Sequence, residues 1–191
     1  MKAMEWTQDS EGKDVYADSN DIVYFPRIIR FEKEGERIIR AGTRSPGTAK
    51  EKTYRLFIEE IPGPRKADGV GVAIALRIGV PIFVKPLKEE QKGEIGPVAM
   101  SKGVVSVPVK NTGNVHFVVQ SVALKGKSRS GEVVFSRELS GWYLLAGASR
   151  RYETSVPAEV CGNLASVEVE VKAGKIILNG KVDADQATCA P

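Results

Sequence analysis

The sequence predicts an all-β protein built of two β-sandwich domains, and three observations carry this prediction. Apolar residues alternate with a period of two through most of the chain, and no long stretch has the period of an amphipathic helix. Gly and Pro residues mark turns about every ten residues. A charged segment at residues 85–97, KPLKEEQKGEIGP, divides the strands into two groups. A length of 191 residues suits two domains of ordinary size.

Each predicted strand is an alternating run rich in Val, Ile, Tyr and Phe that ends at turn-forming residues. The first group comprises residues 22–24, 28–31, 36–41, 54–60 and 71–84. The second group comprises residues 104–110, 115–125, 132–138, 142–145, 152–156, 166–171 and 175–182. We therefore expect a first domain at residues 1–87, a linker at 88–97 and a second domain at 98–191.

Composition excludes two classes of protein. The net charge is +4, but the 28 Lys and Arg are scattered among 24 Asp and Glu, so the chain lacks the concentrated basic face typical of nucleic-acid binding. No apolar run approaches the roughly 20 residues that a membrane-spanning helix needs. The opening residues, MKAMEWTQDSEGKD, do not have the pattern of an export signal. We expect no nucleic-acid partner and no membrane span.

Residues suited to catalysis or metal binding are scarce. The only histidine, His116, lies among alternating apolar residues, where a structural role is more common than a catalytic one. Glu59 and Glu60 are adjacent in sequence and therefore face opposite sides of a strand, so they cannot form a paired acid–base site. Cys161 and Cys189 fit either two buried thiols in the cytosol or one disulfide in an oxidising compartment. The sequence predicts no catalytic residue, no metal site, no cofactor and no enzymatic activity.

One strand has an unusual row of apolar side chains. In VAIALRIGVPIFVKP, at residues 72–86, seven branched residues share one parity and therefore one face. We expect such a row to be buried, either in the core of its own domain or against another chain. These residues are Val72, Ile74, Leu76, Ile78, Val80, Ile82 and Val84.

This strand belongs to a set of motifs that resembles a known family. YRLFIEEIP at 54–62, followed by residues 72–86, resembles the last two strands of the first domain in periplasmic pilus-assembly chaperones of the chaperone–usher pathway. Further matches, in the family's order, are WTQ at 6–8, YFPRIIRFEKEGERIIRAG at 24–42, NTGNVHF at 111–117 and GWYLLAGASRRYE at 141–153. The resemblance implies two immunoglobulin-like sandwiches set at an angle, with the client subunit bound in and beside the cleft.

The resemblance also implies a mechanism, donor-strand complementation, in which the chaperone lends alternate apolar side chains to a pilin subunit that lacks a strand. By this alignment Val72, Ile74, Leu76 and Ile78 enter the subunit, whereas Val80, Ile82 and Val84 fit the core of their own domain equally well. The implied partners are pilin-type subunits and an outer-membrane usher, and the implied location is the periplasm. The alternative is a two-domain structural or adhesive protein that assembles with itself through the same exposed strand.

Polar residues of the family site are matched only in part. The family's carboxylate-binding lysine corresponds to Pro81, and Arg77, on the same face, is the candidate replacement or a solvated strand residue. Glu60, Lys85 and Asp183 match an interdomain ion bridge, with Asp185 as the next acidic candidate. The other interpretation is that these charged side chains are exposed and contribute little to stability.

Two further expectations follow from the resemblance. Cys161 and Cys189 fit a periplasmic disulfide in the second domain. The family's first domain has a signal peptide and two strands before the position that matches Trp6, so we expect an incomplete first domain. Core residues Ile28, Ile38 and Phe57 would then be exposed, and copies of the chain would self-associate.

Overall fold

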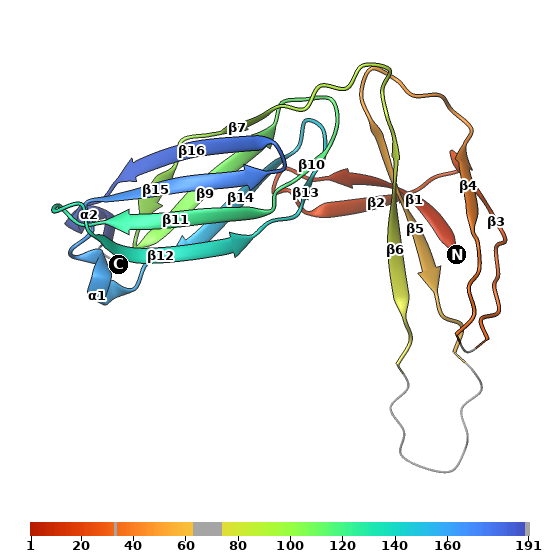
Figure 1. Cartoon of the computed structure of the whole chain (residues 1–191), viewed down its shortest axis with the longest axis horizontal. Coiled ribbons are helices and arrows are strands. Elements are labelled where there is room, and N and C mark those ends of the chain that lie inside the picture. Colours follow the sequence, from red (N-terminus) through yellow and green to blue (C-terminus); the bar gives the residue numbers. More distant parts are fainter. Residues whose placement is uncertain (33, 63–73, 190–191) are drawn as a thin grey trace, which may run out of the picture.

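The structure is a computed structural model that describes residues 1–32, 34–62 and 74–189. The regular secondary structure of the described chain is almost all β-strand, and the chain forms two domains joined by a short connection (Figure 1). Strands β5 and β6 of the first domain run nearly across the direction of the second domain's strands, so the molecule is bent (Figure 1). The predicted all-β class and two-domain architecture are confirmed. None of the described helices is long and apolar enough to span a membrane.

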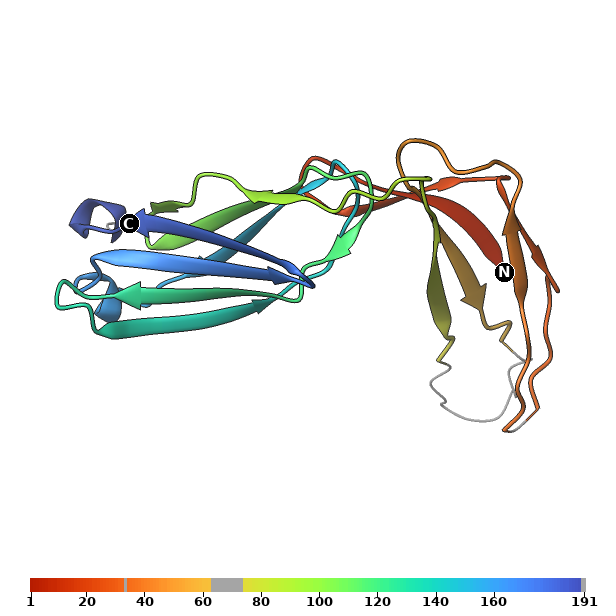
Figure 2. The ribbon, with the colours of Figure 1, turned by 45° about the horizontal axis from the view of Figure 1, so that its top comes forward.

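The first domain consists of one antiparallel sheet with a hairpin beside it. The sheet has the order β2-β1-β5-β6, and β3 pairs with β4 in the hairpin, which runs alongside the β5–β6 pair (Figure 2). Their bounds are β1 Lys2–Gln8, β2 Asp14–Asp18, β3 Ile22–Phe25, β4 Arg40–Thr43, β5 Lys52–Glu59 and β6 Arg77–Val84. No strand was expected at residues 14–18, because DVYAD lacks a row of apolar residues. In the structure this segment forms the edge strand β2. The strand expected at 28–31 is absent.

The core of the first domain is small. Ala3, Ile22, Tyr54 and Leu56 are its buried apolar residues, and side chains from the hairpin and β6 pack against them. Beyond this core the hairpin segment leaves several large apolar side chains exposed to solvent. These are Val23, Phe25, Ile28, Phe31 and Ile38.

Exposure was expected at Ile28 and Ile38, and both are exposed. Exposure was also expected at Phe57, and there the prediction is wrong because Phe57 is half-buried. Its ring packs edge-on against Tyr16 at 5.1 Å between centroids, and the guanidinium of Arg77 lies 4.1 Å from its centroid on the same side of the sheet.

The second domain is a full sandwich of two antiparallel sheets. One has the order β12-β11-β15-β16 and the other β14-β9-β7, with β8 also paired to β9. The strands are β7 Gly93–Ile95, β8 Ala99–Ser101, β9 Val104–Asn111, β10 Phe117–Val118, β11 Ser121–Lys127, β12 Val133–Ser140, β13 Tyr143–Leu144, β14 Ser149–Ser155, β15 Ser166–Ala173 and β16 Ile176–Asp183. Because β7 pairs with β9, this sheet begins inside the segment predicted as a linker.

The pattern of alternating valines predicts this core directly. Val105, Val107 and Val109 of β9 are fully buried, as are Val167 and Val171 of β15, whereas their neighbours in sequence face outward. The strand expected at residues 115–125 is instead divided into β10 and β11. β10 pairs with β13 in a separate two-stranded sheet. Between β10 and β11 the Val119 and Gln120 amides donate to the Trp142 and Lys172 carbonyls, so the chain passes from this small sheet to the sheet that contains β11.

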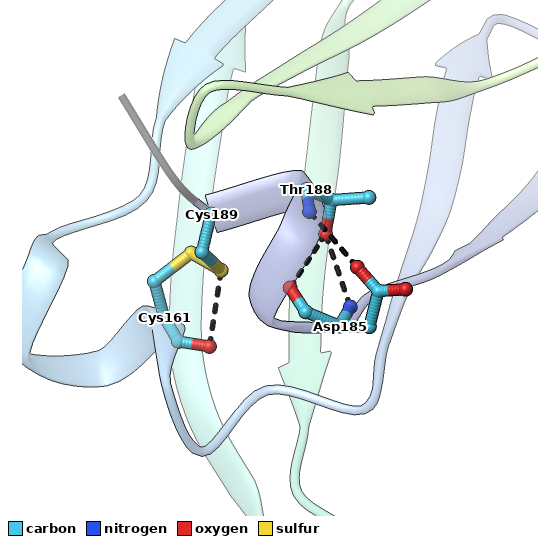
Figure 3. The surroundings of a disulfide bond; sticks show 4 residues. All are labelled: Cys161, Asp185, Thr188 and Cys189. Carbon is cyan, nitrogen blue, oxygen red and sulfur yellow. Dashed lines mark hydrogen bonds between the residues drawn. A yellow bond between two sulfur atoms is a disulfide. The ribbon is translucent and has the colours of Figure 1, made fainter.

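A disulfide links two short helices at the far end of the second domain. Cys161 ends α1 (Ala158–Cys161), Cys189 ends α2 (Gln186–Cys189), and the disulfide joins Cα atoms 5.8 Å apart (Figure 3). Asp185 and Thr188 exchange hydrogen bonds across the start of α2: the Thr188 amide donates to Asp185 Oδ1 at 2.8 Å and the Asp185 amide to Thr188 Oγ1 at 3.0 Å (Figure 3). This is the reciprocal arrangement of a capping box. Asp185 therefore caps a helix and does not bridge the domains.

The domains meet through a hydrogen-bonded Glu51–His116 pair and an aromatic stack. The Glu51 carboxylate is fully buried, and its Oε2 accepts from the His116 amide at 2.8 Å and lies 2.7 Å from His116 Nδ1. The His116 ring stacks on Phe83 of β6 at 3.7 Å between centroids. The Asn114 side chain donates to the carbonyls of Ala49 and Lys88. His116, predicted to be structural, thus holds the second domain against the first.

Removal of the disulfide should destabilise the second domain. By the chain-entropy estimate, closing a loop of this length contributes about 3 to 4 kcal/mol. We expect the Cys161→Ser, Cys189→Ser double variant to unfold at a lower urea concentration by circular dichroism, with reduced wild-type protein matching it as the control. An unchanged midpoint, or two free thiols found by mass spectrometry of the oxidised protein, would contradict the pairing.

Removal of the imidazole at the domain junction should cost more than removal of an exposed ion pair. His116→Ala leaves the buried Glu51 carboxylate without its side-chain hydrogen-bond partner, which typically costs about 1 to 3 kcal/mol, and more for a charged group. Lys172→Ala, which breaks the exposed pair to Glu170, is the control and should cost under about 1 kcal/mol. Urea unfolding measures both values, and X-ray scattering should show a wider spread of shapes for His116→Ala. Equal destabilisation by the two variants would show that the junction contributes little.

Candidate functional site

Strand β6 lies at the edge of the first domain's sheet. It pairs with β5 over its whole length, with Leu56 opposite Val80 and Ile58 opposite Ile78, and has no strand on its other side among the described residues. The pairing continues one step further, because the Glu60 amide donates to the Leu76 carbonyl at 2.9 Å. An edge of this kind presents backbone N–H and C=O groups that can pair with another strand.

The apolar row on this edge becomes steadily more buried along the strand. Ile74 is 80% exposed, Leu76 62%, Ile78 55% and Val80 40%. Ile82 and Val84, on the same face, pack against the core of the first domain. The row therefore covers its own core at one end and is presented to solvent at the other. Val72, the remaining predicted member, lies outside the described residues.

The opposite face of β6 points toward the second domain. Phe83 contacts Trp6 at 6.0 Å and Tyr143 at 5.9 Å between ring centroids, in addition to its stack on His116. Arg77, the predicted carboxylate anchor, lies on this face. Its Nε pairs with Glu59 Oε1 at 2.9 Å, and its side chain is 56% exposed. The Glu59 carboxylate thus already neutralises the guanidinium proposed to bind a subunit.

A different arginine, which sequence reasoning missed, lies in the middle of this face. Arg55 of β5 stands directly opposite Pro81 of β6, the position that matches the family lysine, and only 8% of it is exposed. Its guanidinium carbon is 3.9 Å from the centroid of the Trp6 ring, 5.5 Å from that of Tyr143 and 5.8 Å from that of Trp142. The signal in the sequence is an arginine within YRLFI, at a position where the register faces Pro81.

The predicted interdomain bridge is not formed. Lys85 pairs with Glu89 at 3.0 Å and Asp183 with Lys181 at 3.1 Å, while Glu60 accepts a hydrogen bond from the Leu76 amide at 3.2 Å. Each of these charges is satisfied by a residue near in sequence or on the paired strand, so none reaches across the junction. Glu51 and His116 make the interdomain pair instead.

A polar pocket of about 710 Å³ lies where β1 and β5 meet the loop at residues 145–148 of the second domain. Asp21 lies on its wall, and hydrogen bonds from Ser45 and then from Tyr54 hold the pKa of this carboxyl well below its usual range. Burial, followed by the hydrogen bond to Asp21, raises the pKa of Tyr54 above its ordinary value. These contacts connect loop residues to β5 and are satisfied within the first domain. No metal-binding group of His, Cys, Asp and Glu occurs among the described residues.

Comparisons with known proteins agree with this arrangement. Residues 2–89 match the family described as pili and flagellar-assembly chaperone, PapD N-terminal domain. A search of curated sequences found no match.

Two solved structures have the same fold. One, described as "Chaperone-tip adhesin complex is vital for synergistic activation of CFA/I fimbriae biogenesis", is 16% identical, with a TM-score of 0.53 over 96% of this chain and 84% of that one. The other, the class 5 fimbriae chaperone CfaA, is 13% identical, with a TM-score of 0.51 over 94% and 83%.

The family match covers the whole first domain, including the β5–β6 pair, and the structural matches extend the likeness over both domains. The matched family is one of assembly chaperones and not of enzymes. Residues 2–89 are therefore similar to the PapD N-terminal domain of pili and flagellar-assembly chaperones, and the two domains together have the fold of the two solved structures.

Proposed function

We propose that the protein binds pilin-type subunits by donor-strand complementation through β6. The observation that carries the proposal is the exposed apolar row of Ile74, Leu76 and Ile78 along a sheet edge that no other described strand pairs with. A subunit strand can add to this edge through backbone hydrogen bonds, while its own core takes up the alternate side chains. Val72 extends the row in sequence, and we include it in the donated set.

The energetics of such binding suit a transient chaperone complex. Each aliphatic side chain that becomes fully buried contributes about 1.5 to 3 kcal/mol. Loss of rigid-body freedom and ordering of side chains oppose this gain. Because Ile82 and Val84 already pack against their own core, β6 is held in register at one end and presents its other end to the subunit. The donated end is thus ordered in part before binding.

We infer that this chaperone acts in the periplasm and delivers its subunit to an outer-membrane usher without ATP. The disulfide between Cys161 and Cys189 supports an oxidising compartment, because disulfides do not persist in most cytosolic proteins. Delivery would proceed by exchange of β6 for a strand of the next subunit. The energy for exchange is stored in the subunit, which completes its fold only after β6 leaves.

Leu76→Glu should abolish the complex with a strand-deficient pilin-type subunit that the wild-type protein binds. A carboxylate at this position would have to be buried in the subunit core without a partner. Co-expression followed by affinity purification of the tagged chaperone measures the yield of soluble complex, and we expect a loss of more than about tenfold.

Ile177→Glu is the matched control for this experiment. Ile177 lies on β16 of the second domain and is 58% exposed, close to the 62% of Leu76. The control should leave complex yield unchanged. Undiminished complex with Leu76→Glu would exclude β6 as the donated strand. A chain that polymerises alone and ignores the subunit would favour a structural or adhesive role.

We also expect copies of the free protein to associate at micromolar concentration. The open edge of β6 and the exposed Ile28 and Ile38 of the hairpin segment present apolar surface that a second copy can cover. Light scattering should give an average mass above that of the monomer, and Leu76→Glu should lower it. A single monomeric species for the wild type would contradict this expectation.

A further inference from the structure

The hairpin of β1 and β2 reaches from the first domain to the second (Figure 1). Its turn, at residues 9–13, is held by hydrogen bonds of its own. Asp9 Oδ1 accepts from the Glu11 amide at 2.8 Å and from the Lys13 amide at 2.9 Å, and the Gly12 amide donates to the Asp9 carbonyl at 3.0 Å. An Asp side chain that bonds the backbone two residues on is a local turn signal. The hairpin therefore has a fixed shape where it meets the second domain.

Gln8, the last residue of β1, bonds to the second domain as a backbone peptide group would. Its Nε2 donates to the Tyr143 carbonyl at 2.9 Å, and its Oε1 accepts from the Leu145 amide at 2.9 Å. Nε2 also donates to Asp14 Oδ1 at 3.0 Å, and Asp14 Oδ2 accepts from Trp142 Nε1 at 3.0 Å. The side-chain amide and carboxylate thus connect both strands of the hairpin to one short segment, residues 142–145.

Gly12 allows the turn to approach the second domain closely. Its φ of +76° lies in the left-handed region, which favours glycine. A Cβ at this position would lie 2.7 Å from the Ser149 carbonyl oxygen and 2.8 Å from Arg150 Cβ, at the start of β14. Both atoms belong to rigid parts of the strand, so any larger residue would have to move the hairpin away from β14.

This contact is separate from the one made by Glu51, His116 and Phe83. It involves β1, β2 and residues 142–150, whereas the other involves β6 and the segments around residues 51 and 116. Domains joined by a small polar interface ordinarily move relative to each other. A single contact leaves rotation about that contact, and a second contact on different elements removes most of this freedom.

We propose that Gln8, Gly12 and Asp14 form a hairpin clamp that sets the angle between the domains and thereby positions β6 for the client. This inference rests on the proposed function, because a subunit that adds to β6 must fit beside the second domain. A fixed angle keeps that space open before binding, which lowers the ordering cost of the complex. The three residues act through the second domain and are positioning residues.

Two glycine variants test the clamp in the free protein. Gly131 also has a positive φ, +84°, but no described atom lies within 4 Å of a Cβ added there. Gly12→Ala and Gly131→Ala therefore share the same kind of backbone strain, and only the first collides with the other domain. Residual dipolar couplings of ¹⁵N-labelled protein measure the relative orientation of the domains. We expect Gly12→Ala to change it and Gly131→Ala to keep it, and the same orientation in both variants would overturn the proposal.

A glutamine pair keeps the test available if Gly12→Ala fails to fold. Gln120 Oε1 also accepts from a backbone amide, that of Gly174 at 3.3 Å, but within the second domain. We expect Gln8→Ala to broaden the distribution of interdomain orientations and Gln120→Ala to leave it as in the wild type. Couplings within each domain check that both variants fold. A wild-type protein whose domains already reorient independently, or equal effects of the two variants, would contradict the clamp.

Subunit binding tests the positioning role. If only a tenth of the molecules keep the competent orientation, the apparent affinity falls about tenfold. Gly12→Ala and Gln8→Ala should therefore weaken binding of the strand-deficient subunit by about this factor, and Gly131→Ala and Gln120→Ala should not. Reoriented domains with undiminished subunit binding would overturn the positioning role.

Failure of the clamp and failure of the proposed function have different signatures. If Leu76→Glu abolishes subunit complexes but Gly12→Ala matches Gly131→Ala throughout, the chaperone function stands and the clamp is wrong. If Gly12→Ala turns the domains while Leu76→Glu leaves complexes intact, the hairpin sets the angle and donor-strand binding by β6 is wrong.

Discussion

The antiparallel pairing of β5 with β6 is the constraint on which the rest of the site depends. Since side chains alternate along a strand, this one register sends Ile78, Val80 and Ile82 to one face and Pro81 and Phe83 to the other. The first face supplies both the core of the first domain and the exposed row. The second face supplies the contact with the second domain and places Arg55 opposite Pro81. A shift of the β5–β6 pairing by one residue would exchange the side chains of the two faces. The exposed apolar row and the contact with the second domain would then both be lost.

The two domains differ in the size of their cores and in the apolar surface that they expose. The second domain has a large core of alternating valines and a disulfide that closes its far end. The first domain has only a few buried apolar residues and keeps much apolar surface exposed. Contact through Glu51, His116 and Phe83 couples β6 to the domain with the larger core. A strand that must leave its exposed row uncovered can remain ordered because its last residues are held on both faces.

Local sequence patterns predicted the strands, which depend on residues close in sequence. They did not predict the contacts between residues that are far apart in sequence. Alternation of Val105, Val107 and Val109 identified the core strands, and the apolar row at residues 72–84 identified the edge strand. The bridge proposed for Glu60, Lys85 and Asp183 did not form, because each charge found a partner nearby. The Glu51–His116 pair joins residues 65 positions apart, and no local pattern indicates such a contact. The family resemblance supplied the disulfide pairing that spacing alone left open.

The missed residue, Arg55, shows that part of the first domain is not optimised for stability. Its Nε and Nη2 are buried without a hydrogen-bond partner among the described residues. An unsatisfied buried donor costs about 1 to 3 kcal/mol, and more when the group is charged. Well-packed apolar residues at the same position would stabilise the protein. The cation–π contact with Trp6 offsets part of this cost, and the rings of Trp142 and Tyr143 lie close by. The first domain therefore combines a small core with a costly buried charge, which makes its contact with the second domain more important for keeping β6 ordered.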